Sequence, residues 1–356
     1  MDNNHPQVNF GKTGVLLINL GTPDTTGWWD IRKYLNEFLS DRRVIEVNPF
    51  LWKIILNLFI LTFRPSKTAK AYKEIWMKEE NISPLRYYTI KQAEKVKSII
   101  SNENLVVDYA MRYGNPSIKS KMLDLQENGC ENIIILPLYP QYAAATTATV
   151  CDEVYRTLMK MRWQPSLQII PHYESEPLYI RAIVNSINHK LSSINWKPDL
   201  ILASYHGIPK KYFDKGDPYY CYCHKTSRLI KENFSKDIPI LTTFQSRFGP
   251  QEWLQPYTDK TLESLPKEGS KNVHAYVTGF VPASGEVTCK TEEFLENEGW
   301  RWQEVTYCPY QYDSFVSLET GEPVHVSPMV DLDSCELFGN VMAMVLTNQP
   351  MESIKL

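Results

Sequence analysis

Short apolar runs alternate along this chain with longer amphipathic stretches, and this alternation limits its fold more than any other feature. The apolar runs have the length of buried strands, and the stretches between them have the length and periodicity of helices. Such alternation is typical of βαβ units built around parallel sheets. The expected strands are residues 13–20, 105–110, 132–137, 167–171, 200–204, 239–243 and 273–278, with helices over 68–77, 89–102, 147–161, 177–192 and 222–234.

Two segments far apart in the sequence resemble each other. GVLLINLGTPD (14–24) and LILASYHGIPK (200–210) both run from an apolar strand into a Gly-x-Pro turn, and alignment on the glycine places Leu20 opposite His206. We therefore expect two similarly wound α/β lobes with a site between them. Because α/β sheets bind ligands at the carboxyl ends of their strands, His206 is either a site residue or a histidine that is hydrogen-bonded at a strand end.

The composition is that of an ordinary globular protein, and it excludes several classes. Of 356 residues, 43% are hydrophobic and 22% charged, and 38 basic against 41 acidic residues give a net charge of −3. Nothing in this balance attracts nucleic acid. Seven scattered cysteines do not make a disulfide framework. The N-terminus lacks a basic region followed by an apolar stretch, so we expect no signal peptide and a reducing, cytosolic environment.

One segment, FLWKIILNLFILTF at 50–63, is unusually apolar. It is shorter than the roughly 20 apolar residues that a membrane-spanning helix needs. It could be a buried core helix, or it could rest on a membrane surface through side chains such as Trp52, Phe59 and Leu61. Flanking basic residues that could meet anionic headgroups favour the membrane; these are Arg42, Arg43, Arg64 and Lys67.

Motifs for other chemistries are incomplete. GKTG at 11–14 precedes its strand and lacks the earlier glycine of a phosphate-binding loop, and no G-x-G-x-x-G follows any strand. Cys221, Cys223 and His224 are of metal-ligand type, but a structural zinc site usually has two separated pairs of ligands. A second pair is not visible, so we interpret these as loop residues without a metal.

Aromatic and polar side chains gather after three of the expected strands. They lie at 111–116 (MRYGNP), at 139–142 (YPQY) and at 243–250, with Trp253 close behind the last group. Together with His206 they describe a cleft with aromatic walls and few charges. Such a cleft suits a large, flat aromatic ligand better than a sugar or a nucleotide phosphate.

A set of longer segments, spread from residue 14 to about 280, carries a family resemblance. In chain order they are LLINLGTPD, FLSDRRVIE, SPL (83–85), MRYGNP, LPLYPQY, SYHGIP, DKGDPYYCYCHKT and TFQSRFGPQEWLQPYTD. In these segments and their order the chain resembles the ferrochelatase family, which carries out the last step of haem synthesis, and the similarity is closer to bacterial protoporphyrin enzymes than to the coproporphyrin branch. The resemblance implies a lyase that inserts Fe²⁺ into protoporphyrin IX to give protohaem.

The resemblance implies the class II chelatase fold, an α/β fold of two doubly wound, Rossmann-like lobes with parallel sheets and the active-site cleft between them. We expect an N-terminal lobe of residues 10–160 plus 330–356, with a membrane-facing lip at about 42–67. Residues 161–329 would form the C-terminal lobe that carries the catalytic histidine. The expected location is the cytoplasm, peripherally on the inner membrane, where the preceding oxidase of the pathway would be a partner.

The resemblance also implies roles for individual residues. His206 is the family's invariant histidine. Arg112 and Tyr113 form the pair implicated in metal delivery or binding on the opposite porphyrin face. Because a guanidinium repels a cation and cannot ligate one, we assign Arg112 to orienting Tyr113 or a propionate. The remaining porphyrin-contacting positions are Leu20, Tyr139 and Trp253, with Arg64 near the lip, where it can meet a propionate.

The chain departs from the family at its second catalytic position. Where the family has Gly-Phe-x-x-Asp-Cys-x-Glu-Thr, this chain has GFVPASGEV, in which Glu286 keeps the seven-residue spacing and Ala283 replaces the aspartate. An alternative alignment places residues 289–292 (CKTE) on the family motif, and this chain then has no glutamate at the catalytic position. We expect His206 and Glu286 to be the catalytic and metal-contacting pair, and which porphyrin face the metal enters stays open.

Two other functions are kept as alternatives. The altered 280–290 stretch is compatible with a catalytically impaired porphyrin- or haem-binding protein, and related folds include chelatases for another tetrapyrrole or metal, such as cobalt.

Ala144 stands where iron–sulfur-containing animal members have a cysteine. We therefore expect no iron–sulfur cluster and no required cofactor, with Fe²⁺ as a substrate.

Overall fold

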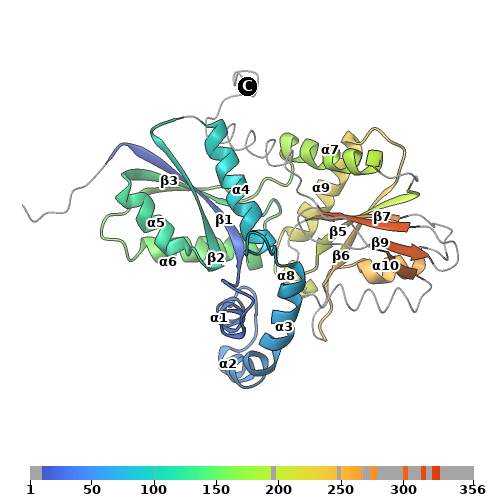
Figure 1. Cartoon of the computed structure of the whole chain (residues 1–356), viewed down its shortest axis with the longest axis horizontal. Helices are drawn as coiled ribbons and strands as arrows, with labels where there is room; N and C mark the ends of the chain where they lie inside the picture. Colours follow the sequence, from blue (N-terminus) through green and yellow to red (C-terminus); the bar gives the residue numbers. More distant parts are fainter. Residues whose placement is uncertain are drawn as a thin grey trace, which may run out of the picture. The chain divides into compact units, whose positions relative to one another are not determined.

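The chain forms two compact units, each with its own sheet (Figure 1). Among the described residues, unit 1 comprises 10–67 and 78–172, and unit 2 comprises 68–77 and 173–328. The lobe boundaries expected from the sequence stay a prediction, because residues 330–356 lie outside the described part. The computed structural model describes residues 10–100, 102–193, 198–246, 250–265, 267, 273–278, 300–303, 314–317 and 323–328.

Unit 1 is built on a parallel sheet with the strand order β2-β1-β3-β4. The central strand, β1, is a continuous apolar run, and residues 15–18 within it are fully buried. A strand that is covered on both faces loses the usual alternation of polar and apolar residues, which explains this run. The strands are β1 (Lys12–Thr22), β2 (Leu105–Gly114), β3 (Cys130–Pro137) and β4 (Ser166–Ile169).

Helices connect these strands, and side-chain caps mark where three of them begin. Asn48, Ser83 and Ser117 each accept backbone N–H groups of the following first turn, which would otherwise lack partners. The helices are α1 (Trp28–Leu39), α2 (Pro49–Ile55), the π-helical turn η1 (Leu56–Ile60), α3 (Leu61–Ile75), α4 (Pro84–Ile99), α5 (Ile118–Glu127), the π-helical turn η2 (Ala144–Ala148) and α6 (Thr149–Leu158). From residue 68 onwards α3 belongs to unit 2.

Unit 2 has a sheet with the strand order β6-β5-β7-β10-β9-β8. Its first four strands in this order are parallel, and β9 and β8 add antiparallel pairs. The strands are β5 (Leu200–His206), β6 (Ile240–Gln245), β7 (Val273–Thr278), β8 (Trp300–Gln303), β9 (Ser314–Ser317) and β10 (Pro323–Pro328); the described helices are α7 (Pro177–Ser193), α8 (Lys210–Asp214), α9 (Tyr219–Asn233) and α10 (Thr258–Ser264).

The two units are wound in the same way. In each, the first strand is central, the second pairs on one side of it and the third pairs on the other, giving 2-1-3 and 6-5-7. This confirms the predicted α/β class with doubly wound parallel sheets. In such sheets the winding reverses direction between the first and third strands, and ligands bind beside the carboxyl ends of the strands at that point.

The glycines of the two similar sequence segments occupy equivalent places. Gly21, with φ of +112°, lies against β2, and a β-carbon built on it would be 1.8 Å from the carbonyl oxygen of Tyr113. Gly207 lies against β6, where a β-carbon would be 2.8 Å from the carbonyl oxygen of Gln245. In both units the end of the central strand approaches the backbone of the second strand too closely for any side chain.

This geometry predicts the effect of adding a methyl group at Gly21. We expect Gly21→Ala to lower the free energy of unfolding by roughly 4 kcal/mol or more, because the β-carbon would overlap the neighbouring strand. Gly11 is the matched control, since its φ is +91° and nothing lies within 4 Å of its added β-carbon. Gly11→Ala should cost only about 1 kcal/mol for the unfavourable φ. Urea unfolding followed by tryptophan fluorescence measures both, and equal losses would contradict the close approach.

Candidate active site

The carboxyl edges of the two sheets carry most of the residues that the sequence analysis selected. In unit 1, Leu20 is near the end of β1, Arg112 and Tyr113 are near the end of β2, and Tyr139 follows β3. Leu20 lies between the paired positions 19↔111 and 21↔113, so it is opposite Arg112 in register. In unit 2, His206 is the last residue of β5.

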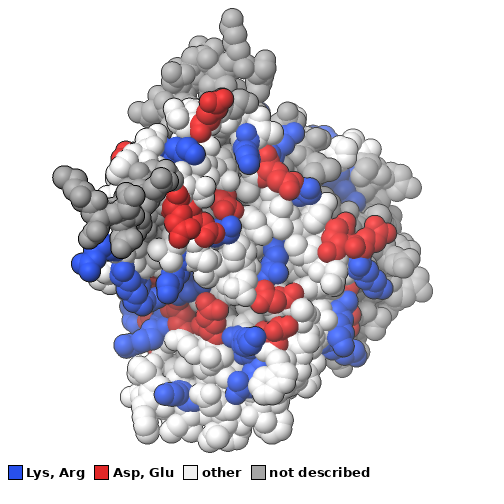
Figure 2. Space-filling view, turned by 60° about the vertical axis from the view of Figure 1, so that its left-hand side comes forward, with Lys and Arg blue, Asp and Glu red and all other residues white. Residues whose placement is uncertain are grey.

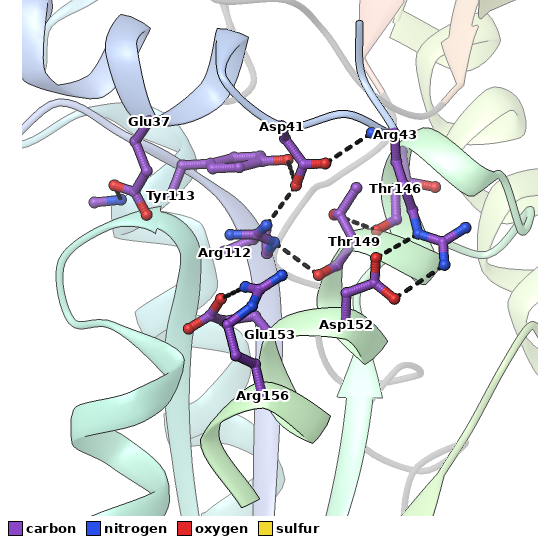
Figure 3. Close-up of polar contacts among 11 residues, drawn as sticks. Glu37, Asp41, Arg43, Arg112, Tyr113, Thr146, Thr149, Asp152, Glu153 and Arg156 are labelled. Carbon is purple, nitrogen blue, oxygen red and sulfur yellow. Dashed lines mark hydrogen bonds and ion pairs between the residues drawn. The ribbon is translucent and has the colours of Figure 1, made fainter. Parts of the chain in front are cut away.

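Arg112 and Tyr113 share one carboxylate oxygen (Figure 3). The Nη2 of Arg112 donates to Oδ2 of Asp41, and the hydroxyl of Tyr113 donates to the same oxygen over 3.0 Å. The Nε of Arg112 donates to the carbonyl oxygen of Thr149 over 2.8 Å, and the guanidinium carbon lies 4.3 Å from the centre of the Tyr113 ring. Asp41 and the Thr149 carbonyl therefore hold the pair, and the guanidinium lies over the phenol ring.

Asp41 is the residue of this group that the sequence analysis missed. It follows Ser40, the C-cap residue of α1, and its Oδ1 accepts the backbone N–H of Arg43 over 2.8 Å. Its side chain is only 11% exposed, and that of Arg112 only 7%. The segment FLSDRRVIE supported the family resemblance and contains Asp41. Its contacts with Arg112 and Tyr113 depend on the packing of α1 beside β2.

A further layer of polar contacts surrounds this group. Arg43 forms an ion pair with Asp152 of α6, with distances of 2.5 and 3.0 Å from Nε and Nη2. Glu37 of α1 accepts the backbone N–H of Gly114 over 2.9 Å, just after Tyr113. Burial raises the pKa of Glu37, and the hydrogen bond from Gly114 lowers it in part.

Burial also determines the protonation state of Tyr113. The side chain is fully buried, and this raises the pKa of its hydroxyl well above 10; Arg112 nearby acts in the opposite direction. Tyr113 is therefore a neutral phenol at physiological pH. As a phenol it can donate its proton to Asp41 and accept a hydrogen bond from elsewhere, whereas a phenolate could not donate.

The remaining predicted residues of unit 1 are Leu20, Tyr139 and Arg64. Leu20 is 3% exposed and Tyr139 6% exposed, so both contribute to the buried surface at the carboxyl edge. Arg64 is half-buried on α3.

His206 is held in one tautomer by its own turn. Its Nδ1 lies 2.6 Å from the carbonyl oxygen of Gly207. A carbonyl oxygen can only accept, so Nδ1 carries the proton and Nε2 carries the lone pair. Burial lowers the pKa of His206 from 6.5 to about 4, although the hydrogen bond to Gly207 opposes this change. At neutral pH the side chain is an uncharged base.

The turn after His206 is fixed to the segment that contains Trp253. The backbone N–H of Gly207 donates to the carbonyl oxygen of Gln245 over 2.7 Å, and Pro209 and Trp253 form an isolated antiparallel bridge. A β-carbon on Gly207 would lie 3.3 Å from the indole ring of Trp253. The structure thus brings His206 and Trp253, two of the predicted residues, to one edge of unit 2.

Glu286, the predicted partner of His206, lies outside the described residues. The strand that precedes it in the chain, β7, is parallel to β5 and pairs Thr278 with Tyr205, so the chain leaves β7 at the edge where His206 lies. Among the residues that the structure describes, no group of three or more His, Cys, Asp or Glu side chains is arranged to hold a metal ion.

The cysteines at 221 and 223 lie in α9, so the prediction that they are loop residues is wrong. Cys221 is exposed and Cys223 is buried, and both are free. The ring of His224 packs against those of Tyr220 and Phe244, at centroid distances of 4.4 and 6.0 Å. This part of the helix packs against β6, and the structure shows no metal knuckle in it.

Comparisons with known proteins agree with this arrangement. The sequence profile of the ferrochelatase family matches residues 12–314. The chain belongs to the ferrochelatase family. A ferrochelatase of Allorhizobium ampelinum is 57% identical over 279 residues, which cover 78% of this chain and 81% of that protein. A ferrochelatase of Agrobacterium fabrum is 49% identical over 328 residues, which cover 90% and 94% of the two chains.

A solved structure shows the same fold at much lower identity. SirB from Bacillus subtilis with Fe³⁺ aligns with a TM-score of 0.50 and 12% sequence identity, and the alignment covers 95% of this chain and 96% of SirB. At this identity the likeness concerns the fold alone, and it agrees with the doubly wound sheets of both units.

The state of His206 can be tested without an activity assay. The imidazole ¹⁵N signals of His206 can be assigned as those that are absent from the spectrum of His206→Gln. We expect these signals to remain those of a neutral, Nδ1-protonated ring as the pH falls from about 7.5 to about 5.5, because burial disfavours the charged form. Titration near 6.5 would contradict the assignment. The unfolded chain would bind this proton near pH 6.5, so His206 should also reduce stability as the pH falls from 6.5 towards 4.

Proposed function

We propose that this member of the ferrochelatase family inserts Fe²⁺ into protoporphyrin IX to form protohaem, the last step of haem biosynthesis. The observation that carries the proposal is His206, which stands as a neutral base at the carboxyl edge of unit 2 in a chain that matches the family over most of its length. A porphyrin-binding protein without catalysis would not need a histidine held in this state.

The reaction requires a base and a distorted macrocycle. A free-base porphyrin carries two pyrrole N–H groups, so entry of one Fe²⁺ releases two protons and leaves the net charge of the macrocycle unchanged. The inward-pointing nitrogen lone pairs must turn towards the metal, and binding energy that buckles the ring favours the transition state over the flat substrate. The protein must supply a proton acceptor close to the ring centre and walls that hold the ring in a bent form.

His206 meets the first requirement. With Nδ1 protonated and bonded to Gly207, Nε2 is the atom that would accept a pyrrole proton. We assign Glu286 to accepting or leading away that proton, or to ligating the entering metal together with His206. An imidazole and a carboxylate can serve either purpose.

The other predicted residues would hold the macrocycle. Leu20, Tyr139 and Trp253 are assigned to contacts with the ring, and Arg64 to a propionate. Arg112 and Tyr113 would lie on the porphyrin face opposite His206 and take part in metal delivery. The assignment includes no iron–sulfur cluster and no resident cofactor, with Fe²⁺ as a substrate.

One assay separates the proposal from its alternatives. We expect anaerobic wild-type protein to quench porphyrin fluorescence when Fe²⁺ is added, and His206→Ala to bind porphyrin but insert no iron. Glu286→Gln should lower turnover on the order of 10²-fold, as for a general acid–base partner. Near-normal turnover of His206→Ala would contradict its assignment, and a silent Glu286→Gln would remove Glu286 from the site. Wild-type protein that binds porphyrin without inserting iron would be a porphyrin- or haem-binding protein.

We further propose that the enzyme rests on the cytoplasmic face of the inner membrane. The structure describes no helix that is long and apolar enough to cross a membrane. However, large apolar side chains of α2, η1 and α3 face outwards. In Figure 2 white surface predominates at the bottom, the end that α2 occupies in Figure 1. The exposed side chains in this segment are Phe50, Leu51, Ile54, Leu58, Phe59 and Phe63.

These exposures identify which side chains would enter the membrane. Leu61 is fully buried, and Trp52 is half-buried with its indole N–H donating to the carbonyl oxygen of Leu39 over 2.7 Å. Of the three contact residues expected from the sequence, Phe59 is exposed and Trp52 is partly exposed, whereas the choice of Leu61 was wrong because it is fully buried. Clustered apolar surface of this kind is typical of an interaction site and is costly in water. A membrane position would also bring the enzyme to the preceding oxidase of the pathway.

Liposome binding tests the membrane proposal. We expect the protein to sediment partly with anionic liposomes, and the triple variant Phe50→Ser, Phe59→Ser, Phe63→Ser to remain in the supernatant with an unchanged melting temperature, because these side chains contribute little to the core. Met159→Ser is the matched control, since Met159 is 74% exposed but lies at the end of α6. Loss of folding in the triple variant, or equal binding by all three proteins, would contradict the proposal.

A further inference from the structure

The carboxylate of Asp41 accepts three hydrogen bonds. Its Oδ1 accepts the backbone N–H of Arg43, and its Oδ2 accepts both the Arg112 guanidinium and the Tyr113 hydroxyl (Figure 3). Three donors on two oxygens suit an ionised carboxylate. The backbone bond to Arg43 fixes the carboxylate in the turn after α1, so that its second oxygen faces the end of β2.

The first consequence of this contact concerns charge. Arg112 is buried beside the carboxyl edge of its sheet, and an unpaired guanidinium there would repel a divalent cation strongly, because few water molecules screen it. Asp41 is buried with it and carries the opposite charge. The pair presents no net charge to a cation that approaches the edge.

The second consequence concerns the direction of the Tyr113 hydroxyl. Its proton is donated to Asp41, and the side chain of Thr149 also hydrogen-bonds to the phenol oxygen, so the hydroxyl is fixed from both sides. Stacking of the Arg112 guanidinium over the ring, at 4.3 Å, holds the phenol in place. Tyr113 is fully buried and stays a neutral phenol, so beside the compensated Arg112 it adds no charge to the edge that a cation would approach.

We propose that Asp41 is a positioning residue for iron insertion, which cancels the charge of Arg112 and directs the Tyr113 hydroxyl so that Fe²⁺ can approach this edge of unit 1. The inference rests on the proposed function, in which Arg112 and Tyr113 take part in metal delivery. It answers the difficulty of a cationic side chain on the path of a cation.

The neighbouring pair Arg43–Asp152 provides the matched control. It is also an arginine–aspartate pair of unit 1, but it is much more exposed, with 43% and 36% of the two side chains accessible. Asp152 contacts neither Arg112 nor Tyr113 in any described hydrogen bond, and Arg43 reaches Asp41 through its backbone N–H. Asp152→Asn therefore removes an ion pair of the same kind while the Asp41 contacts remain.

The test measures the KM values for Fe²⁺ and for porphyrin in wild type, Asp41→Asn, Arg112→Leu, the double variant and Asp152→Asn. We expect Asp41→Asn to raise the KM for Fe²⁺ on the order of tenfold, with the porphyrin KM changed by less than about twofold, because only the cation senses the uncompensated charge. Arg112→Leu should lower the KM for Fe²⁺, because it leaves the negative charge of Asp41 uncompensated. The double variant should return this KM towards the wild-type value, and Asp152→Asn should not change it.

A structural role would give a different pattern. If Asp41 only stabilised the fold, Asp41→Asn would lower the melting temperature and kcat without a selective effect on the KM for Fe²⁺, and the double variant would not restore it; either result overturns the inference. If Asp41→Asn does not fold, the test compares the KM for Fe²⁺ of Arg112→Leu with that of the double variant. The charge effect requires Arg112→Leu to have the lower KM, and any other order overturns the inference. An active wild type with no selective effect overturns this inference alone, whereas an inactive wild type overturns it together with the proposed function.

Discussion

The close backbone approach at the end of each central strand is the constraint on which both edges depend. Gly21 lies against the carbonyl group of Tyr113, and Gly207 donates its N–H to the carbonyl oxygen of Gln245. A side chain at either glycine would push the first strand away from the second. Because the strands stay together, the residue before each glycine is held against its neighbour, and in unit 2 that residue is His206. The base is therefore fixed by sheet packing rather than carried on a loop.

The two edges deal with buried polar groups in different ways. In unit 1 a charge is retained and compensated, since Arg112 is paired with Asp41 and Tyr113 is kept neutral by burial. In unit 2 the charge is avoided, since burial keeps His206 unprotonated and Gly207 accepts its Nδ1 proton. Both solutions avoid an uncompensated buried charge, which would be costly. They also suit a reaction in which a large apolar ring meets a divalent cation and releases protons.

The elements that could be predicted from the sequence share one property, which is that their burial is visible in the local pattern of apolar residues. All seven expected strands are present, because strands of a covered parallel sheet are continuous apolar runs. Helices such as α1 and α5 were not among the helices expected from the sequence. The antiparallel strands β8 and β9 were also missed; each has only four residues, and a run of that length carries little periodicity.

The sequence by itself determined the α/β class, the similar winding of the two halves, the family and the position of His206 at a strand end, because each is written in local patterns and motifs. Tertiary structure alone decided that Asp41 meets Arg112, 71 residues away, and that Leu61 is buried whereas Phe63, two residues later, is exposed. It also decided the protonation state of His206. The physical reason is common to all three: contacts between distant residues and the exclusion of water exist only after the elements have packed.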